Sequence, residues 1–333
     1  MSATTAPANL VTTFSELRRR AQPERLLRLG VVVADDEIAL SAAAAAFRLG
    51  IILPVLIGNT QAIRAKLESP ALHELTINAQ YFDADDAAAL AVQLVRDGEV
   101  DLLLKGHLRT DELLRAVLDK SAGLRTGRVL SDVLLYEDNL AGDHPNERKI
   151  GARQGPRCAT RLVGISDGGL NVLPNLEQKK QIVENAIAVM RGLGLARPKI
   201  AIMSATEAVS DSVPSSVDAR RLSEMGAAGD FGNAEVFGPL ALDCALLESA
   251  ARDKGISHPV AGHADCMIVP NIEAGNLLGK SVKYLGGSQC AHVVVGARAP
   301  ILIPSRVESV DDKVNSIALG VLFAGSRVQN SHD

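Results

Sequence analysis

Residues 29–57 read LGVVVADDEIALSAAAAAFRLGIILPVLI, and this stretch decides the fold class. Two short runs rich in Val, Ile and Leu, at 29–34 and 51–57, flank an Ala- and Leu-rich amphipathic segment at 36–49. Short apolar runs are typical of buried strands, and the longer segment between them is typical of a helix. The stretch therefore predicts a strand–helix–strand unit of an α/β protein.

The same alternation continues along the rest of the chain. We expect further strands at 101–104, 129–136, 199–203, 266–269, 292–295 and 301–303. We expect further helices at 61–68, 83–95, 110–118, 175–193, 240–253, 272–285 and 311–323. Strands and helices in this order predict a parallel sheet with helices on both faces, and such sheets bind ligands at the carboxyl ends of their strands.

Composition and charge narrow the class of protein. The chain has 333 residues, a length that suggests two domains. Its formal net charge of −4 argues against a broad nucleic-acid-binding surface, which needs clustered positive charge. The first residues carry no positively charged stretch before an apolar run, and no run reaches the roughly 18–20 apolar residues of a membrane span. We therefore expect a cytoplasmic protein with no nucleic-acid or membrane partner.

Several common motifs are absent from the sequence. The four cysteines form no Cys-x-x-Cys pair, and the histidines show no metal-binding spacing, so we expect no metal site. There is no Gly-x-Gly-x-x-Gly and no Walker A pattern, so no motif for a dinucleotide or for nucleotide phosphates is present.

The first candidate site is LLLKGHLRTDELLR, at 102–115. An apolar strand ends at Lys105 and Gly106, where glycine permits a sharp turn or a close backbone approach. Thr110 is expected to cap the following helix, and Arg115 lies further along it. A helix start flanked by basic side chains is typical of an anion site. An ordinary capped helix with solvated basic residues explains the same pattern.

The second candidate site is GHADCMIVPNIEAGNLLGK, at 262–280. A buried strand leads into polar residues at the start of a helix, which are Asn271, Glu273, Gly275 and Asn276. Polar side chains at the end of a strand suit ligand binding, but Pro, Asn and Gly also suit turns that have no function.

The third candidate site lies in VVVGARAPILIPSRVESVDDKV, at 293–314. An apolar strand ends at Pro304 and is followed by Ser305 and Arg306, with Asp312 seven residues beyond the serine. The serine and arginine suit the positioning of a thiol or a phosphate, and the aspartate suits a base. The alternative is that Ser305 or Ser309 caps the last helix and that Asp312 complements the helix dipole.

Taken together and in this order, these segments resemble the phosphate acetyltransferase and phosphate butyryltransferase family. The resemblance extends from about residue 30 to residue 325 and also includes FGPLALDCALLESAARDKGI, at 237–256. It implies two three-layer α/β/α domains with a cleft between them, similar to the isocitrate/isopropylmalate dehydrogenase-like fold. It places residues 1–136 and 290–333 in domain one and 137–289 in domain two. It also implies a homodimer.

The resemblance implies an acyltransferase that moves a short acyl group, acetyl to butyryl, between coenzyme A and inorganic phosphate in a ternary complex. Coenzyme A is then a substrate, and no cofactor is bound permanently. By the same resemblance Ser305, Arg306 and Asp312 are catalytic. The residues expected to bind phosphate and coenzyme A are Lys105, Gly106, Thr110, Arg115, Asn271, Glu273, Gly275 and Asn276.

The sequence also departs from the family pattern. The basic segment that precedes the strand at 101–104 in acetyltransferases corresponds here to the apolar AAALAVQLVRDGEV, at 87–100. The polar excursion at 137–157 is longer than is usual. These departures leave open a second interpretation, a catalytically impaired protein of the same fold that binds coenzyme A or phosphate and has a regulatory role. A metal-dependent dehydrogenase of the same fold would need a carboxylate cluster that the sequence does not show.

Overall fold

The computed structural model describes residues 10–23, 25–138, 160–305 and 307–329. These residues form two compact units. The first unit comprises residues 17–133, 169–171 and those from 291 onward. The second comprises those up to 16, 134–168 and 172–290. The α/β class predicted from the sequence is confirmed, and each unit is described by itself below.

The first unit is built on a mostly parallel sheet. Its strand order is β3 (Gln80–Asp83), β2 (Ile52–Gly58), β1 (Leu27–Val32), β4 (Leu102–Lys105), β11 (Ile301–Leu302) and β10 (Cys290–Val295). All neighbouring pairs are parallel except β11 and β10, which are antiparallel. Because β4 and β11 run in the same direction, the segments that follow them leave the sheet at the same edge.

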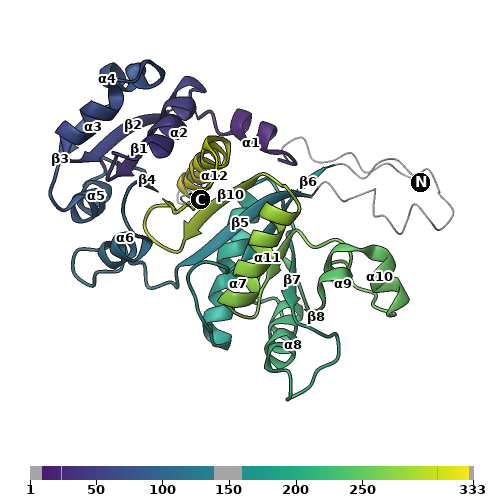
Figure 1. Ribbon diagram of the computed structural model, residues 1–333. Coiled ribbons are helices and arrows are strands. Elements are labelled where there is room, and N and C mark those ends of the chain that lie inside the picture. The colour runs from purple at the N-terminus through teal and green to yellow at the C-terminus, as the bar shows by residue number, and fades with distance from the viewer. Residues whose placement is uncertain (1–9, 24, 139–159, 306, 330–333) are drawn as a thin grey trace. The chain divides into compact units, whose positions relative to one another are not determined.

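Helices cover both faces of this sheet. The helices α2 (Glu37–Arg48) and α12 (Val310–Gln329) contact each other on one face, and α5 (Ala87–Arg96) and α6 (Thr110–Val117) contact each other on the opposite face (Figure 1). The shorter helices α3 (Thr60–Leu67), η1 (Pro70–Leu72) and α4 (His73–Asn78) contact one another beside β2. The core beneath α5 and α6 consists of small and branched aliphatic side chains, as the low aromatic content requires.

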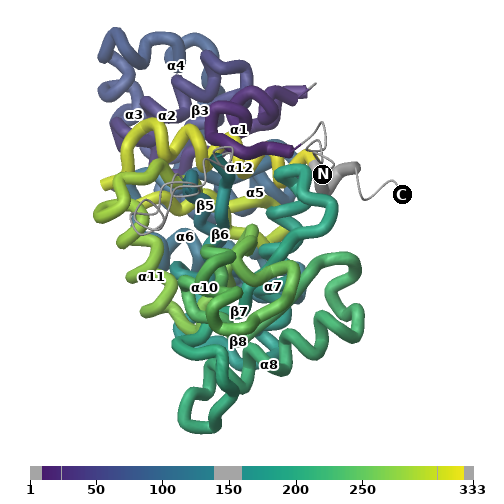
Figure 2. The backbone as a smooth tube through the Cα atoms, turned by 90° about the vertical axis from the view of Figure 1, so that its right-hand side faces the viewer, coloured from purple at the N-terminus to yellow at the C-terminus, as the bar shows by residue number. Residues whose placement is uncertain are grey.

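The second unit repeats the three-layer plan. Its strand order is β5 (Ser131–Asp138), β6 (Arg161–Ser166), β9 (Cys266–Ile268), β7 (Lys199–Met203) and β8 (Glu235–Leu240). Only β5 and β6 are antiparallel among these neighbours. The helices α7 (Leu176–Gly192) and α8 (Pro214–Ala227) pack on one face, and α9 (Leu242–Leu246), α10 (Glu248–Asp253) and α11 (Ile272–Lys280) pack on the other. In Figure 2, α11 and α7 lie on opposite sides of the strands.

The helix α1 (Phe14–Arg20) follows a segment that belongs to the second unit. The backbone N–H of Val11 donates to the carbonyl of Leu193 at 2.9 Å, and that of Phe14 donates to the Glu137 carboxylate at 2.7 Å. The expected range 1–136 counted these residues in domain one, whereas their hydrogen bonds run to residues of the second unit. Of the excursion expected at 137–157, the first two residues belong to β5, and 139–157 lie outside the described residues.

Three expectations about the elements need correction. The sheet is not purely parallel, because β10 and β5 each pair antiparallel with a neighbour. The expected helix at 240–253 is two short helices that meet at Leu247, whose φ of −116° and ψ of 116° are extended rather than helical. The expected helix at 272–285 is regular only to Lys280 and then widens into a π-helical turn, η2 (Ser281–Leu285).

Candidate functional site

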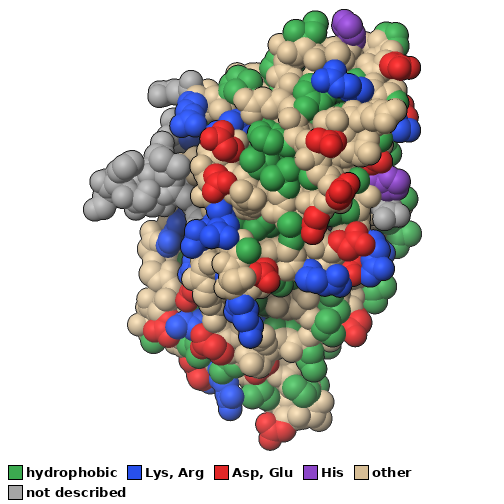
Figure 3. All heavy atoms as spheres, turned by 90° about the vertical axis from the view of Figure 1, so that its left-hand side faces the viewer, with side chains coloured by type: hydrophobic (Ala, Val, Ile, Leu, Met, Phe, Trp, Pro, Cys, Tyr) green, Lys and Arg blue, Asp and Glu red, His purple; other side chains and the backbone are tan. Residues whose placement is uncertain are grey.

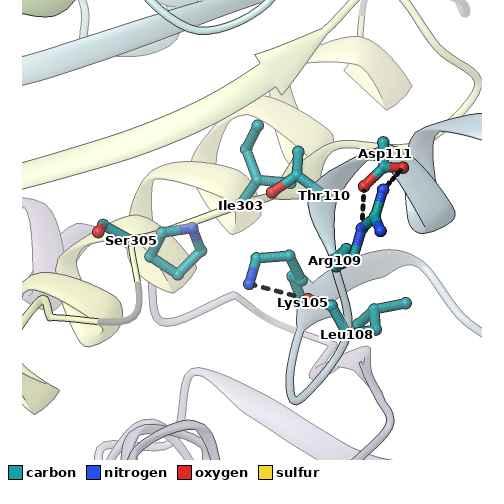
Figure 4. A pocket seen from close by; sticks show the side chains of 8 residues that line it. Lys105, Leu108, Arg109, Thr110, Asp111, Ile303 and Ser305 are labelled. Carbon is teal, nitrogen blue, oxygen red and sulfur yellow. Dashed lines mark hydrogen bonds and ion pairs between the residues drawn. The ribbon is translucent and has the colours of Figure 1, made fainter.

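A cavity of about 460 Å³ lies at the carboxyl ends of β4 and β11 in the first unit (Figure 4). Three of the residues predicted from the sequence line it together: Lys105 at the end of β4, Thr110 at the start of α6, and Ser305 after β11. The other lining residues are Leu108, Arg109, Asp111, Ile303 and Pro304. The parallel pairing of β4 with β11 thus brings together two segments that are about 200 residues apart in the sequence.

Gly106 is required by the close approach of the chain at this edge of the sheet. Its backbone N–H donates to the carbonyl of Val32 at 2.9 Å. A side-chain carbon on Gly106 would lie 2.7 Å from the Val32 oxygen and nearer still to that of Val33. Val33 itself has a φ of 55°, which is strained for a β-branched residue. Gly106 therefore shapes the floor of the loop and does not line the cavity.

The start of α6 differs from the expectation. Arg109, not Thr110, occupies the N-cap position, and its backbone N–H donates to the Glu112 carboxylate at 3.1 Å. The predicted cap at Thr110 is therefore wrong by one residue, and Thr110 is the first residue of the helix. The Arg109 guanidinium donates to Asp111 through Nε at 2.8 Å and through a second nitrogen at 2.5 Å. Asp111 therefore neutralises the charge of Arg109 at the mouth of the cavity.

Lys105 is the buried cation of the cavity. Its residue is 6% exposed, and its Nζ donates to the carbonyl oxygen of Leu108 at 3.4 Å. An ammonium group held in a largely dry wall attracts an anion more strongly than one in water, because the local dielectric is lower. Lys105 is therefore the cavity residue best suited to attract an anion.

Arg115 does not line this cavity. Its side chain is 77% exposed on α6 and lies 3.7 Å from the Asp111 carboxylate, one helical turn earlier. An exposed pair of this kind contributes little to stability, because water screens both charges. In this structure, Arg115 therefore has the environment of a solvated helix residue.

The turn after β11 is tied to the start of α12. Ser309 and Asp312 form a reciprocal cap, in which the Asp312 backbone N–H donates to Ser309 Oγ at 3.1 Å. Asp312 Oδ2 in turn accepts from Ser309 Oγ at 2.5 Å and from the Ser309 backbone N–H at 3.2 Å. Asp312 is 1% exposed and does not line the cavity. Arg306 lies outside the described residues.

A network of buried charges stands behind the same turn. Glu308, which is 6% exposed, accepts the backbone N–H of Ser305 through Oε1 at 3.0 Å. His292 Nε2 lies 3.6 Å from the same oxygen, and His292 Nδ1 lies 3.1 Å from Asp132 Oδ2. Burial by itself lowers the pKa of His292, but the carboxylates of Asp132 and Glu308 outweigh it and raise the pKa to about 9. His292 is therefore an imidazolium at neutral pH.

Lys313 completes this network from the first turns of α12. Its Nζ donates to the carbonyl oxygen of Ser305 at 3.1 Å, and its residue is 3% exposed. Burial lowers the pKa of Lys313, while Glu308, Asp36 and Asp312 act in the opposite direction. The sequence analysis did not predict the residues of this network. Asp132, His292 and Glu308 are brought together only by tertiary packing, and the only local signal was the polar run at 305–313.

The predicted residues of the second unit have local structural roles. Asn271 caps α11 by accepting the Ala274 backbone N–H at 2.9 Å. A side-chain carbon on Gly275 would lie 2.6 Å from the α-carbon of Gly168, so glycine is needed where α11 meets the chain. Asn276 Nδ2 donates to the Gly168 carbonyl at 3.4 Å, and Glu273 is exposed in the first turn of the helix. These contacts fit the turn interpretation of the segment.

Among the described residues, one group has the composition of a metal site. It consists of Glu207, Asp243 and Cys244, whose ligand atoms lie within 4.8 Å of one another. The Lys254 ammonium already pairs with Glu207 at 2.9 Å and with Asp243 at 3.2 Å. A lysine thus supplies the positive charge that a metal ion would bring to these carboxylates.

One face of the described surface has a mixed charge. Acidic and basic side chains are interspersed over the face in Figure 3. Within the described residues, no helix is both long enough and apolar enough to cross a membrane.

The chain is similar to known proteins over most of its length. The model of the family described as phosphate acetyl/butaryl transferase matches residues 78–321. A phosphate acetyltransferase of Rhizobium meliloti is 38% identical over 296 residues, covering 88% of this chain and 87% of that protein. A phosphate butyryltransferase of Clostridium acetobutylicum is 34% identical over 321 residues, covering 96% and 100%. The crystal structure of a branched-chain phosphotransacylase from Enterococcus faecalis V583 superposes with a TM-score of 0.74 at 28% identity, covering 90% of this chain and 99% of that one.

Proposed function

Because the chain belongs to the phosphate acetyl/butaryl transferase family, we propose that it moves a short acyl group, acetyl to butyryl, between coenzyme A and inorganic phosphate. The products are an acyl phosphate and free coenzyme A, and the reaction is reversible. The observation that links this proposal to particular residues is the cavity that Lys105, Thr110 and Ser305 line together.

The proposed chemistry transfers the acyl carbon directly. When acyl phosphate is consumed, the thiol of coenzyme A loses its proton and the sulfur attacks the acyl carbon. The carbonyl oxygen gains negative charge, the bond from carbon to the phosphate oxygen breaks, and phosphate leaves as an anion. Both substrates are bound before transfer, so no covalent intermediate with the protein forms.

The lining residues fit the charges that this reaction develops. The Lys105 ammonium suits the phosphate anion, since hydrogen bonds to charged groups are the stronger ones. The Ser305 hydroxyl suits the thiol or the oxyanion, to which a fixed donor gives its largest benefit in the transition state. Asp312 is the carboxylate that the family resemblance puts forward as the base. In this structure it is buried behind the cavity and binds the two Ser309 donors, so this role requires the turn at Ser309 to open.

The test measures the release of free thiol from acetyl-, propionyl- and butyryl-coenzyme A, with and without phosphate. We expect release that depends on phosphate with at least one of these substrates. We expect Lys105→Met to weaken the use of phosphate by at least tenfold, because a charged hydrogen bond is worth about 1.5–3 kcal/mol.

Lys66→Met is the matched control, because it removes an exposed lysine on α3 that does not line the cavity. Initial rates measured over a grid of both substrate concentrations should give intersecting double-reciprocal lines. Parallel lines would contradict the ternary complex. Phosphate-independent release, or no release with any acyl chain, would contradict the proposed function.

A further inference from the structure

The peptide groups of Ser305 are held from both sides by buried charges. The backbone N–H of Ser305 donates to Glu308 Oε1 at 3.0 Å. The carbonyl oxygen of Ser305 accepts from Lys313 Nζ at 3.1 Å. Ser305 itself is exposed to the cavity, whereas Glu308 and Lys313 are only 6% and 3% exposed. Two buried side chains of opposite charge therefore hydrogen-bond to the backbone of one exposed serine.

The Glu308 carboxylate is in turn contacted by His292. His292, on β10, lies with Nε2 3.6 Å from Glu308 Oε1. Its other ring nitrogen lies 3.1 Å from Asp132 Oδ2 on β5. The His292 backbone N–H donates to Ser316 Oγ on α12 at 2.9 Å, which ties β10 at this residue to the helix that carries Lys313. The chain of contacts thus runs from Asp132 through His292 and Glu308 to Ser305.

Stability alone does not account for this arrangement. Burying charged groups is costly, and well-packed apolar side chains of similar volume are often as stable or more so. The charges here converge on the two peptide groups of a residue that the cavity exposes. A network that ends on an exposed hydroxyl-bearing residue is suited to holding that residue in place, since small misplacements of reacting groups can lower rates about a hundredfold.

We propose that Glu308, Lys313 and His292 are positioning residues, which hold the turn at Ser305 so that its hydroxyl meets the substrate at one place. The inference rests on the proposed function, in which Ser305 contacts the thiol or the oxyanion. None of the three needs to touch the substrate. Their effect is transmitted through the Ser305 backbone, so it disappears when the Ser305 hydroxyl is absent.

The experiment compares Lys313→Met, Lys313→Arg, Ser305→Ala and the double variant Ser305→Ala/Lys313→Met. We expect Lys313→Met to lower kcat at least tenfold with each KM within about threefold of the wild type. We expect Lys313→Arg to restore most of kcat, because arginine keeps a cationic donor. In the Ser305→Ala background, the Lys313→Met change should lower kcat by less than twofold.

Lys179→Met is the matched control. Lys179 is also a buried lysine, 6% exposed, and pairs with Asp218 at 2.8 Å in the second unit. Its loss should lower the melting temperature and leave the kcat of the folded protein unchanged. If Lys313→Met does not fold, Glu308→Gln carries the same test, because it removes the charge that holds the Ser305 N–H and keeps the shape of the side chain.

The outcomes separate the two claims. No phosphate-dependent thiol release by the wild type would overturn the proposed function, and this inference with it. An active wild type with impaired Ser305→Ala, but with Lys313→Met and Glu308→Gln at wild-type kcat, would overturn the inference alone. So would equal losses from Lys313→Met in the presence and absence of the Ser305 hydroxyl.

Discussion

His292 shows how one residue takes its properties from its neighbours. Three carboxylates from different segments raise its pKa: Asp132 of β5, Glu308 of the turn after β11, and Asp312 of α12. Each of them acts against the effect of burial, which lowers the pKa of an imidazole. Nothing in the tripeptide around His292 indicates this, because all three carboxylates come from elsewhere in the chain.

The raised pKa of His292, about 9, predicts a loss of stability at alkaline pH. The folded protein binds this proton more tightly than the unfolded chain, whose histidine pKa is near 6.5. The stabilisation is therefore complete below about pH 6.5 and is lost as the pH rises through 9. The shift corresponds to a contribution on the order of 3 kcal/mol. Thermal unfolding followed from pH 6.5 to 9.5 should show a steeper fall for the wild type than for His292→Asn.

His258 and His263 do not produce the same slope. Burial lowers the pKa of His258 and His263, so their effect on stability falls below pH 6.5, outside this window. Equal pH dependence of the wild type and His292→Asn between pH 6.5 and 9 would show that the imidazolium does not stabilise the fold.

At the scale of the element, the start of α12 depends on the reciprocal cap between Ser309 and Asp312. Ser309→Ala removes both hydrogen bonds of the hydroxyl, and caps of this kind are worth about 1 kcal/mol. We expect the variant to melt a few degrees below the wild type in differential scanning calorimetry. Ser309→Thr keeps the hydroxyl and should melt close to the wild type. A melting temperature of Ser309→Ala equal to that of the wild type would show that the cap contributes nothing.

The elements that the sequence predicted best are those whose apolar runs are bounded by clear turn residues. The strand at 199–203 was predicted with the bounds it has, and the helix at 36–49 differs from α2 by one residue at each end. Asp36, the first residue of the predicted range, is the N-cap of α2 and accepts the Ala39 backbone N–H. The missed helix α8 begins at Pro214 and contains few large apolar residues, so its periodicity is weak.

At the scale of the whole molecule, burial makes most thiols unreactive. Cys244, Cys266 and Cys290 are buried. Burial raises the pKa of Cys244 to about 11 and raises that of Cys266 as well. Since the thiolate is the reactive form, we expect these three thiols to be inert in the native protein. A thiol reagent should modify no more than one cysteine per chain before denaturation and all four afterwards.

Cys158 lies outside the described residues and provides the control. In Cys158→Ser, the native protein should give no rapid modification, and the denatured protein should give three. Rapid modification of two or more native cysteines in the wild type would contradict the burial of Cys244, Cys266 and Cys290.

The sequence by itself determined the α/β class, the family and the polar segments at the ends of strands. These are local or cumulative properties. A strand or a helix is recognised from the period of its apolar residues, and a family from many short segments in one order. The same local signals predict Lys105, Thr110 and Ser305 as candidate site residues, because each stands where an apolar strand ends or a helix begins.

The tertiary structure alone decided which of these candidates meet and what holds them. The pairing of β4 with β11 brings Lys105 and Ser305 to one cavity, while Arg115 stays exposed on α6 and Asp312 is engaged as a helix cap. Only the fold shows that Glu308 and Lys313 hydrogen-bond to the Ser305 backbone and that His292 contacts Glu308. Hydrogen bonds and ion pairs act over a few ångströms in space. The spacing of two residues along the sequence does not determine the distance between their side chains when they lie on different strands or helices.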